Sequence, residues 1–321
     1  MGYGAGGYIG FAKETTWGTA VAPANYSEGI SESLITNFDR FSNINIVGGR
    51  YYEAEDNAGT QRNAGDVVVP VNPEVLGFFL RGGLGIYTQS TVLSGFLHTA
   101  EFIPNGPGSE FSLASPNPPY TFEIFRDTTS AYRYAGVNVG RMEFSMQPNQ
   151  ELRLSMGVFG KSVAWVAKST ATFPGSPIKP FLSHEASLSI DGAGTALIEA
   201  LTISYDSQLE GIAALNATQE IAKIRRTGPQ LVRVSGTLDF ETDAEWNKFK
   251  NQSAQAFSVN FLKPGSFSLL FTLPKVVYTA FPIGAAGRDR ITVGFEGMGQ
   301  TLGVSSAALI IKLTTVKSGW G

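Results

Sequence analysis

The feature of this sequence that most constrains its fold is an alternation of apolar and polar residues with a period of two. Met142, Phe144 and Met146 alternate with charged and polar residues, and similar alternation recurs within 152–158, 201–205, 232–240 and 291–295. Successive side chains of a β-strand point to opposite faces, so this period predicts strands with one buried and one solvated face. Such strands are typical of antiparallel sheets. We therefore expect a mainly β fold.

Two short segments lack this period and are predicted to be α-helices. Within 72–81, Asn72 is placed to be the N-cap, a proline follows at the first helical position, and Gly82 and Gly83 are expected to end the helix. Within 242–253, Thr242 and Glu245 have the spacing of a capping box. Each predicted helix has one apolar side, which suits packing against a sheet.

The length of 321 residues favours two domains, because a single hydrophobic core rarely serves so long a chain. Turn-forming residues cluster at 104–119 and again at 170–180, as they do in loops and linkers. The second cluster lies near the middle of the chain. We therefore predict one domain at 1–175 and a second at 176–321.

The two halves contain similar segments in the same order. Residues 32–39 resemble 199–206, residues 69–80 resemble 238–249, and residues 140–144 resemble 287–291. The spacing implies an insertion in the first half, and the loop at 104–119 is a place for most of it. Two β-rich halves can share alternation by chance, but the conserved order favours two copies of one domain. Two copies are too few for a solenoid and suit a closed ring better.

The charge of the chain argues against direct recognition of nucleic acid. Its 24 Lys and Arg residues are outnumbered by 27 Asp and Glu residues, and the densest basic tract, 223–226, holds three cations. That tract is too short to neutralise a run of phosphates. The start of the chain lacks the pattern of a secretory signal, and no stretch of about 18 apolar residues occurs, so we expect neither export by that route nor a membrane-spanning helix.

No residue pattern predicts a catalytic, cofactor or metal site. Cysteine is absent, which removes disulfides and thiolate chemistry. His98 and His184 lie in different halves without a Glu or His at metal-ligand spacing, and no Gly-x-Ser-x-Gly motif occurs. The glycines of 1–7 lack the strand and helix that flank a phosphate-binding loop, and the carboxylates of 239–243 fit a solvated strand and a helix start. We expect no enzyme, no cofactor and no metal.

The segment 7–23, which reads Gly-Tyr-Ile-Gly-Phe-Ala-Lys-Glu-Thr-Thr-Trp-Gly-Thr-Ala-Val-Ala-Pro, resembles the start of many tail tube proteins of siphophages, the long-tailed bacteriophages. The passages 134–160 and 198–209 are also similar to that family, although they are less specific. The resemblance thus spans nearly the whole chain. It implies two tandem β-sandwich or partly closed barrel domains, each with a short flanking α-helix.

The resemblance also implies an assembly. Single-domain relatives form hexameric rings, so two domains per chain imply a trimeric ring of pseudo-sixfold symmetry, and stacked rings form a tube. The protein is then a structural component of the virion tail, assembled in the host bacterial cytoplasm. Its partners are further copies of itself, a tape-measure protein, a tail terminator and a distal tail protein, with no membrane. DNA passes through the lumen without sequence-specific binding.

In the family, long loops and terminal arms bridge successive rings. By position these are the N-terminal arm 2–30, the segment 41–63, its counterpart 208–227 and the insert at 104–119. The apolar and aromatic residues of the first three are predicted to make inter-ring or inter-subunit contacts: Tyr8, Trp17, Phe41, Ile44, Ile46, Tyr51, Tyr52, Leu209, Ile212 and Leu215. The alternative that each packs onto its own domain stays open.

Two other classes of β-rich protein are alternatives to a tail tube protein. A carbohydrate-binding or adhesive β-sandwich tail component would carry an aromatic cluster at one loop end, whereas Trp17, Trp165, Trp246 and Trp320 are dispersed along the chain. An outer-membrane barrel would show an export signal and regular strands of about ten residues. The adhesive module is the stronger of these two alternatives.

Overall fold

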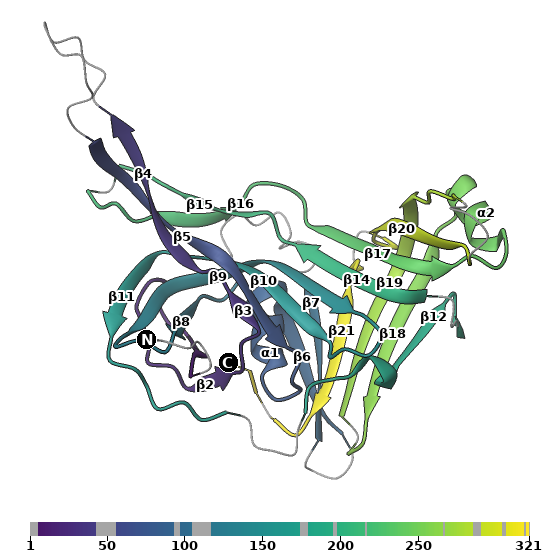
Figure 1. The fold of residues 1–321 in the computed structure, drawn as a ribbon, viewed down its shortest axis with the longest axis horizontal. Coiled ribbons are helices and arrows are strands. Elements are labelled where there is room, and N and C mark those ends of the chain that lie inside the picture. The colour runs from purple at the N-terminus through teal and green to yellow at the C-terminus, as the bar shows by residue number, and fades with distance from the viewer. Residues whose placement is uncertain are drawn as a thin grey trace, which may run out of the picture.

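The computed structural model describes residues 6–42, 56–92, 97–104, 117–173, 179–194, 198–215, 217–265, 267–284, 290–303, 306–317 and 319–320. Within these ranges the chain is mainly β with two short α-helices, as the alternation predicted, and the strands form large antiparallel sheets (Figure 1). We refer to 6–173 as the first half and to 179–320 as the second half.

The first half is built on one long central strand, β9. In chain order it contains β1 (Tyr8–Lys13), β2 (Asn25–Ser27), β3 (Ser31–Glu32), β4 (Ile35–Ser42), β5 (Asp56–Pro70), α1 (Leu76–Leu84), β6 (Gly85–Val92), β7 (Leu97–Pro104), β8 (Tyr120–Phe125), β9 (Ala131–Met146), β10 (Arg153–Gly160) and β11 (Ser162–Val166). β1 pairs with β2 and β8, and the first part of β9 pairs with β8 and β11. The second part of β9 pairs with β10, β10 with β5, and β5 with β3 and β4.

The second half repeats this scheme around β19. It contains a single 3-10 turn η1 (Ser183–Glu185), β12 (Ala186–Ile190), β13 (Ala193–Gly194), β14 (Ile198–Asp206), β15 (Leu209–Ile212), β16 (Lys223–Arg226), β17 (Leu231–Asp239), α2 (Ala244–Lys250), β18 (Gln255–Lys263), β19 (Phe267–Ala280), β20 (Thr292–Gly299) and β21 (Ile310–Thr315). β12 pairs with β13 and β18, β19 pairs with β18, β20 and β21, and β17 pairs with β14 and β20. Each helix follows the corresponding strand, β5 or β17.

The irregularities of the two halves recur as well. β9 bulges next to Arg141, where it pairs with Gly157 of β10. β19 bulges next to Ala280, where it pairs with Glu296 of β20. Bulges re-aim strands and are conserved features of a fold rather than defects. Arg141 and Ala280 are therefore counterparts, and so are Gly157 and Glu296.

This register tests the matches predicted from sequence. Leu154 lies three residues before Gly157 and pairs with Val69. In the same way, Val293 lies three residues before Glu296 and pairs with Leu238. The match of 69–80 with 238–249 is therefore confirmed.

Two other matches need correction. The match of 32–39 with 199–206 is two residues out of register. Glu32 lies opposite Val67, two residues before Val69, and Leu201 lies opposite Gly236, two residues before Leu238. The true counterpart of Glu32 is therefore Leu201. The match of 140–144 with 287–291 is wrong, because β9 corresponds to β19 and not to the start of β20. Residues 285–289 lie outside the described ranges.

The insertion predicted in the first half is a β-hairpin. Strands β6 and β7 pair between α1 and β8, whereas only residues 251–254 connect α2 to β18. The loop at 104–119, proposed to hold most of the insertion, lies largely outside the described ranges. The hairpin was not predicted, and it gives the first half two strands without counterparts.

Helix α1 does not end at Gly82 and Gly83 as predicted. A Cβ atom at Gly82 would lie 2.9 Å from the ring of Tyr120, and one at Gly83 would overlap the side chain of Met142, so the glycines permit close packing inside the helix. The helix ends instead at Gly85, whose φ of 92° favours glycine and whose N–H donates to the carbonyl of Arg81. The helix begins at Leu76 with Val75 as its N-cap, so the prediction that Asn72 is the N-cap is wrong; Asn72 accepts a hydrogen bond from the Glu74 N–H (2.9 Å) in the turn before the helix.

The capping box predicted for α2 does not form. The N-cap residue is Asp243, which makes no side-chain capping bond. Glu245 instead accepts hydrogen bonds from the Tyr278 hydroxyl (2.7 Å) and the Lys248 ammonium (2.9 Å). The bond from Tyr278 attaches the helix to β19, whereas the bond from Lys248 lies within the helix.

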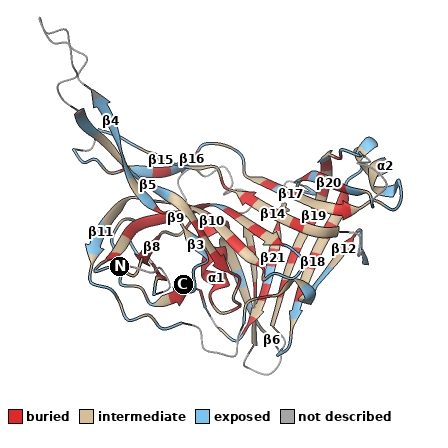
Figure 2. Cartoon of the chain, viewed as in Figure 1, coloured by how far each residue is buried: buried red, intermediate tan, exposed pale blue. Residues whose placement is uncertain are grey.

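The two halves share one hydrophobic core, shown in red in Figure 2. Phe144 of β9 packs edge-on against Phe271 of β19, with ring centroids 4.8 Å apart. The core of the first half is completed by the end of the chain: Trp320 is fully buried, lies against Gly77, and packs on Phe78 at 5.3 Å. The last residues of the second half therefore belong structurally to the first.

Candidate functional site: the joined sheet and its edges

Two antiparallel strand pairings join the halves. In the first junction, β9 pairs with β14 from Arg141 opposite Asp206 to Met146 opposite Leu201. In the second, β7 pairs with β21, with Phe102 opposite Ile311. The first junction makes one continuous sheet in the order β4, β5, β10, β9, β14, β17 and β20 (Figure 1). Because these junctions use backbone hydrogen bonds, they fix how the halves lie relative to each other.

One face of this joined sheet is solvated and carries mostly short polar side chains. On β9, Met142, Phe144 and Met146 point into the core, so the residues between them occupy the other face. The cross-strand register extends that outer face over its neighbours, where it contains Asp66, Val68, Arg153, Ser155, Gly157, Arg141, Glu143, Ser145, Thr202, Ser204, Asp206, Arg233, Ser235, Thr237, Gly294, Glu296 and Met298. Hydroxyls and glycines separate the charges.

The charges on the outer face lie in compensating positions. Arg141 forms an ion pair with Asp66 (3.1 Å) and lies opposite Asp206 in the register. Both partners of the ion pair are about half exposed, so the pair contributes little to stability. Because the two charges offset each other, neither positive nor negative charge dominates this part of the face.

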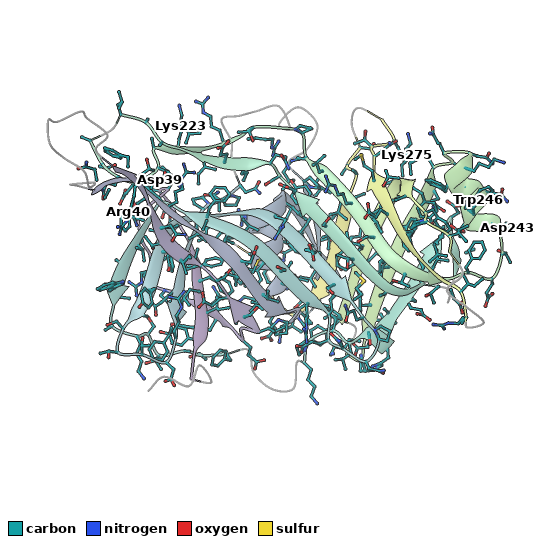
Figure 3. All side chains as sticks on the ribbon, turned by 45° about the horizontal axis from the view of Figure 1, so that its top comes forward. Asp39, Arg40, Lys223, Asp243, Trp246 and Lys275 are labelled. Carbon is teal, nitrogen blue, oxygen red and sulfur yellow. The ribbon has the colours of Figure 1, made fainter. Side chains whose placement is uncertain are left out.

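A long hairpin, β4–β5, projects from the first half beside the shorter hairpin β15–β16 (Figure 1). The two are linked by a hydrogen bond from the Gln61 N–H to the carbonyl of Gln219 (2.6 Å). Phe41 near the end of β4 is 60% exposed. Figure 3 shows Asp39 and Arg40 of this hairpin at the same end of the molecule as Lys223 of β16.

The contact residues predicted from sequence fall into distinct environments. Phe41 and Leu215 are exposed, while Leu209 and Ile212 are half-buried in β15. Trp17 is half-buried and donates from its indole N–H to the carbonyl of Gly136 (3.0 Å). Ile44, Ile46, Tyr51 and Tyr52 lie outside the described ranges. The role of these residues between subunits stays a prediction.

Tyr8 is buried within its own chain. Its ring contacts Tyr26 and Phe125, and its hydroxyl donates to Glu123 (2.7 Å). β1 pairs with β2 and β8, so two segments of the predicted N-terminal arm, 8–13 and 25–27, are part of the first half's own sheet. Whether Tyr8 also meets another subunit stays a prediction.

Sequence reasoning missed two buried carboxylates that hold this sheet. Glu14, 2% exposed, accepts hydrogen bonds at 2.7 Å from the N–H groups of Gly18 and Gly136 and from the Thr121 hydroxyl. Glu123 pairs with Arg133 at 2.6 Å. Burial alone would raise the pKa of Glu123, but hydrogen bonds from Tyr8, Arg133 and Ser169 outweigh burial and lower it. Glu123 takes a polar position between Phe122 and Ile124 of β8, and Glu14 directly follows β1, so nothing in the sequence indicated that either side chain is buried.

The described residues contain no group of three or more His, Asp or Glu side chains that could hold a metal ion. His98 lies in β7 and His184 in η1, so the two histidines are not brought together within one element. A groove of about 820 Å³ between the halves is lined by His184 and by apolar residues that include Met146, Leu201 and Val259. None of the helices in the described ranges is long and apolar enough to cross a membrane.

Comparison with known families identifies the family of the protein that contains this joined sheet. The family model described as phage tail tube protein matches residues 4–307. The chain belongs to the phage tail tube protein family. A search of curated proteins found no match. As a tail tube protein it is a structural component of the virion tail, and membership of a structural family favours a role other than catalysis.

Proposed function

We propose that this tail tube protein polymerises as stacked rings into the tube of the phage tail. Each ring contains three chains, and therefore six units of similar fold arranged with pseudo-sixfold symmetry. The observation that carries this proposal is the repeated pairing scheme, whose two copies are joined side by side through strands β9 and β14. The same kind of pairing, repeated between chains, extends the sheet around a ring. The two units correspond to the proposed domains 1–175 and 176–321.

The ends of the chain support a head-to-tail arrangement. The free edges of the first half lie at one end of the molecule, near Asp39 and Arg40, whereas α2 with Asp243 and Trp246 lies at the opposite end (Figure 3). Contacts between two different surfaces produce closed rings when the rotation closes. Closure also removes exposed strand edges, which otherwise promote aggregation.

The outer face of the joined sheet lines the lumen in this arrangement. Its serine, threonine and glycine residues have short side chains that project little into the lumen. Its acidic side chains are mixed with isolated arginines. Tight binding of DNA needs a dense array of cations that releases counterions from phosphates. A wall with few cations lets DNA pass without sequence-specific binding, as delivery through a conduit requires.

The two projecting hairpins are placed to bridge successive rings. Phe41 on β4–β5, and Leu209, Ile212 and Leu215 on and after β15, offer apolar contacts there. Tail assembly in the host cytoplasm then involves a tape-measure protein inside the tube, with a tail terminator and a distal tail protein at its ends.

Negative-stain electron microscopy of the concentrated protein, with mass photometry of the same sample, tests the proposal. Hollow filaments with a regular axial repeat, and trimers in the diluted sample, are the expected results. A persistent monomer at every concentration and salt strength would contradict the proposal and favour an adhesive tail module instead.

A further inference from the structure

An apolar groove lies open in the first half between strands β4 and β11. It has a volume of about 660 Å³ and is lined by Ile35 and Phe38 of β4, Tyr132 of β9, and Val163 and Trp165 of β11. Trp165 is 77% exposed, and Ile35 and Phe38 are 49% and 46% exposed. Exposed apolar side chains gathered in one place mark an interaction surface more often than scattered ones do. We call this site the β4–β11 groove.

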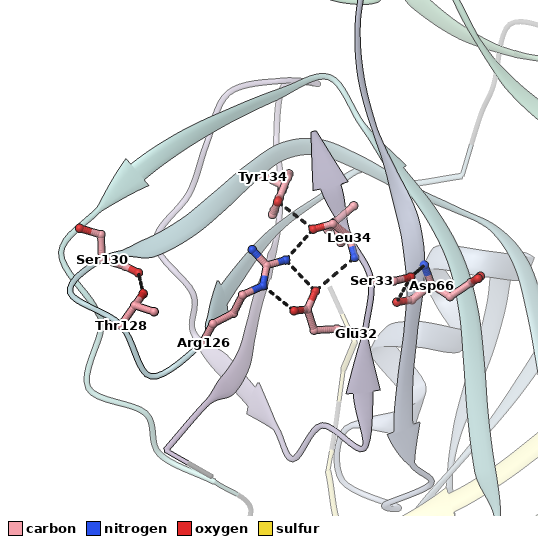
Figure 4. Close-up of polar contacts among 8 residues, drawn as sticks. All are labelled: Glu32, Ser33, Leu34, Asp66, Arg126, Thr128, Ser130 and Tyr134. Atoms are coloured by element: carbon pink, nitrogen blue, oxygen red, sulfur yellow. Dashed lines mark hydrogen bonds and ion pairs between the residues drawn. The ribbon is translucent and has the colours of Figure 1, made fainter. Parts of the chain in front are cut away.

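Two residues that also line the β4–β11 groove, Arg126 and Tyr134, make polar contacts that hold its shape (Figure 4). Arg126 donates to both carboxylate oxygens of Glu32 (2.5 and 2.8 Å) and to the carbonyl of Leu34 (2.7 Å). The Tyr134 hydroxyl donates to the same carbonyl (2.8 Å). The Arg126 guanidinium lies 4.8 Å from the centre of the Tyr132 ring, and Trp165 meets that ring edge-on. The groove is therefore formed before any partner arrives.

The counterpart of this groove in the second half is covered on one edge by β7. Trp165 lies opposite Tyr132 in β9, and its counterpart, Ile311, lies opposite Phe271 in β19. Ile311 is fully buried and pairs with Phe102 of β7. The same strand position is thus exposed in one half and covered by a neighbouring unit in the other.

The second edge is covered in the same way. Asn37 lies opposite Arg62, seven residues before Val69. Its counterpart, Asp206, lies opposite Leu231, seven residues before Leu238, and pairs on its other side with Arg141 of β9. At Asn37, β4 pairs with β5 on one side and with no other described strand. Both edges of the β4–β11 groove therefore lack the strands that cover their counterparts.

We propose that the second half of another copy of this chain docks at the β4–β11 groove, with the end of its β19, at Ala280, beside β4. This inference rests on the proposed ring and names the surface that closes it. Ala280 is the counterpart of Arg141, the residue that pairs with β14 inside the chain. The docking element is therefore the second-half counterpart of β9, the strand that already makes this contact once within each chain.

The contact between chains differs from the one within a chain. The second half has no counterpart of the hairpin β6–β7, since residues 251–254 alone connect α2 to β18. It cannot place a strand beside β11 as β7 is placed beside β21. Trp165 and Val163 are then covered by side chains instead of by strand pairing, which explains why the first half carries a large aromatic residue where the second half carries Ile311.

Engineered cysteines test the docking directly, because the natural chain has none. Asn37→Cys and Ala280→Cys in one chain are expected to form disulfides between chains, since facing residues of antiparallel strands lie within bonding reach. The matched control, Arg141→Cys with Asp206→Cys, places the same pair at the junction within the chain and is expected to form a disulfide without joining chains.

The outcomes separate the docking from the proposed function. Non-reducing gels report the crosslink and microscopy reports the tubes. Tubes without crosslinks between chains overturn the docking and leave the tube proposal intact. Crosslinked oligomers without tubes support the docking and contradict the tube. The absence of crosslinks, in a sample whose control pair does crosslink, overturns the docking whether or not tubes form.

A second variant keeps the test independent of disulfide chemistry. Trp165→Glu is expected to raise the concentration needed for ring formation roughly tenfold or more, because it buries a charge at the contact. Trp165→Phe, which keeps the apolar area, is expected to assemble nearly as the natural chain does. Equal assembly of Trp165→Glu and the natural protein at every concentration would overturn the docking.

Discussion

Replacing Trp320 by alanine tests whether the last residues of the second half hold the first half together. The indole is fully buried against Gly77 and Phe78 of α1. A tryptophan buries on the order of 200 Å², which corresponds to about 5 kcal/mol at about 25 cal/mol per Å². Buried Trp→Ala substitutions cost roughly 3–5 kcal/mol once the cavity is included. We expect Trp320→Ala to lower the free energy of unfolding by about that amount.

The assay is urea unfolding of the monomer at low concentration, followed by circular dichroism. Trp165→Ala is the matched control, because it removes the same side chain from a site that is 77% exposed. We expect the control to change the free energy of unfolding by about 0.5 kcal/mol or less. Equal losses in the two variants would contradict the assignment of Trp320 to the core.

A double-mutant cycle with Gly77 makes the test sharper. A Cβ atom at Gly77 would overlap the Trp320 ring, so Gly77→Ala is expected to destabilise the natural chain. With the ring removed by Trp320→Ala, the same substitution is expected to stabilise the chain by up to about 1 kcal/mol, because alanine is the better helix former. A Gly77→Ala effect of the same sign and size in both backgrounds would refute the contact.

Three further predictions follow from two buried carboxylates and one glycine in β9. Glu14→Leu leaves the donors on Gly18, Thr121 and Gly136 without an acceptor, so we expect unfolding by urea to show a loss of about 3 kcal/mol or more, against little change for Glu210→Leu at an exposed site. The pKa of Glu123 is lowered on folding, so its stabilisation is present at neutral pH and is lost as the pH falls through the folded-state value. Thermal melts between pH 7 and pH 3 should therefore fall less steeply for Glu123→Gln, and parallel curves would contradict the carboxylate's role. Gly136 has a φ of 67°, and a Cβ there would lie 2.8 Å from Lys161, so Gly136→Ala should cost about 2 kcal/mol or more, whereas Gly194→Ala, which meets open space, should cost less than about 1 kcal/mol in the same assay.

Sequence predicted the parts of this fold that depend on local patterns. Met142, Phe144 and Met146 show their buried face through their spacing, because one side of the strand meets the core and the other meets solvent. The match of Val69 with Leu238 also survived, because the strand and the helix that follow it keep their order in both halves.

The errors came from contacts between residues far apart in the chain. Nothing near Gly82 and Gly83 indicates that Tyr120 and Met142 pack against them, so a helix interior resembled a helix end. The polar residues at the start of β5 lack apolar alternation because the hairpin β4–β5 projects away from the core. The β4–β11 groove could not be predicted from sequence, because Ile35 and Trp165 meet only once the sheets are formed.

The packing of Trp320 on α1 and the pairing of β21 with β7 have a consequence for synthesis on the ribosome. The first half emerges well before the residues that complete it, so during translation α1 lacks Trp320 and the edge of β7 opposite β6 lacks β21. An unpaired strand edge and an uncovered apolar helix are features that chaperones and proteases recognise. We expect the native fold to form only after Trp320 has left the ribosome, so that chains terminated before β21 are degraded before they can be incorporated into a growing tail.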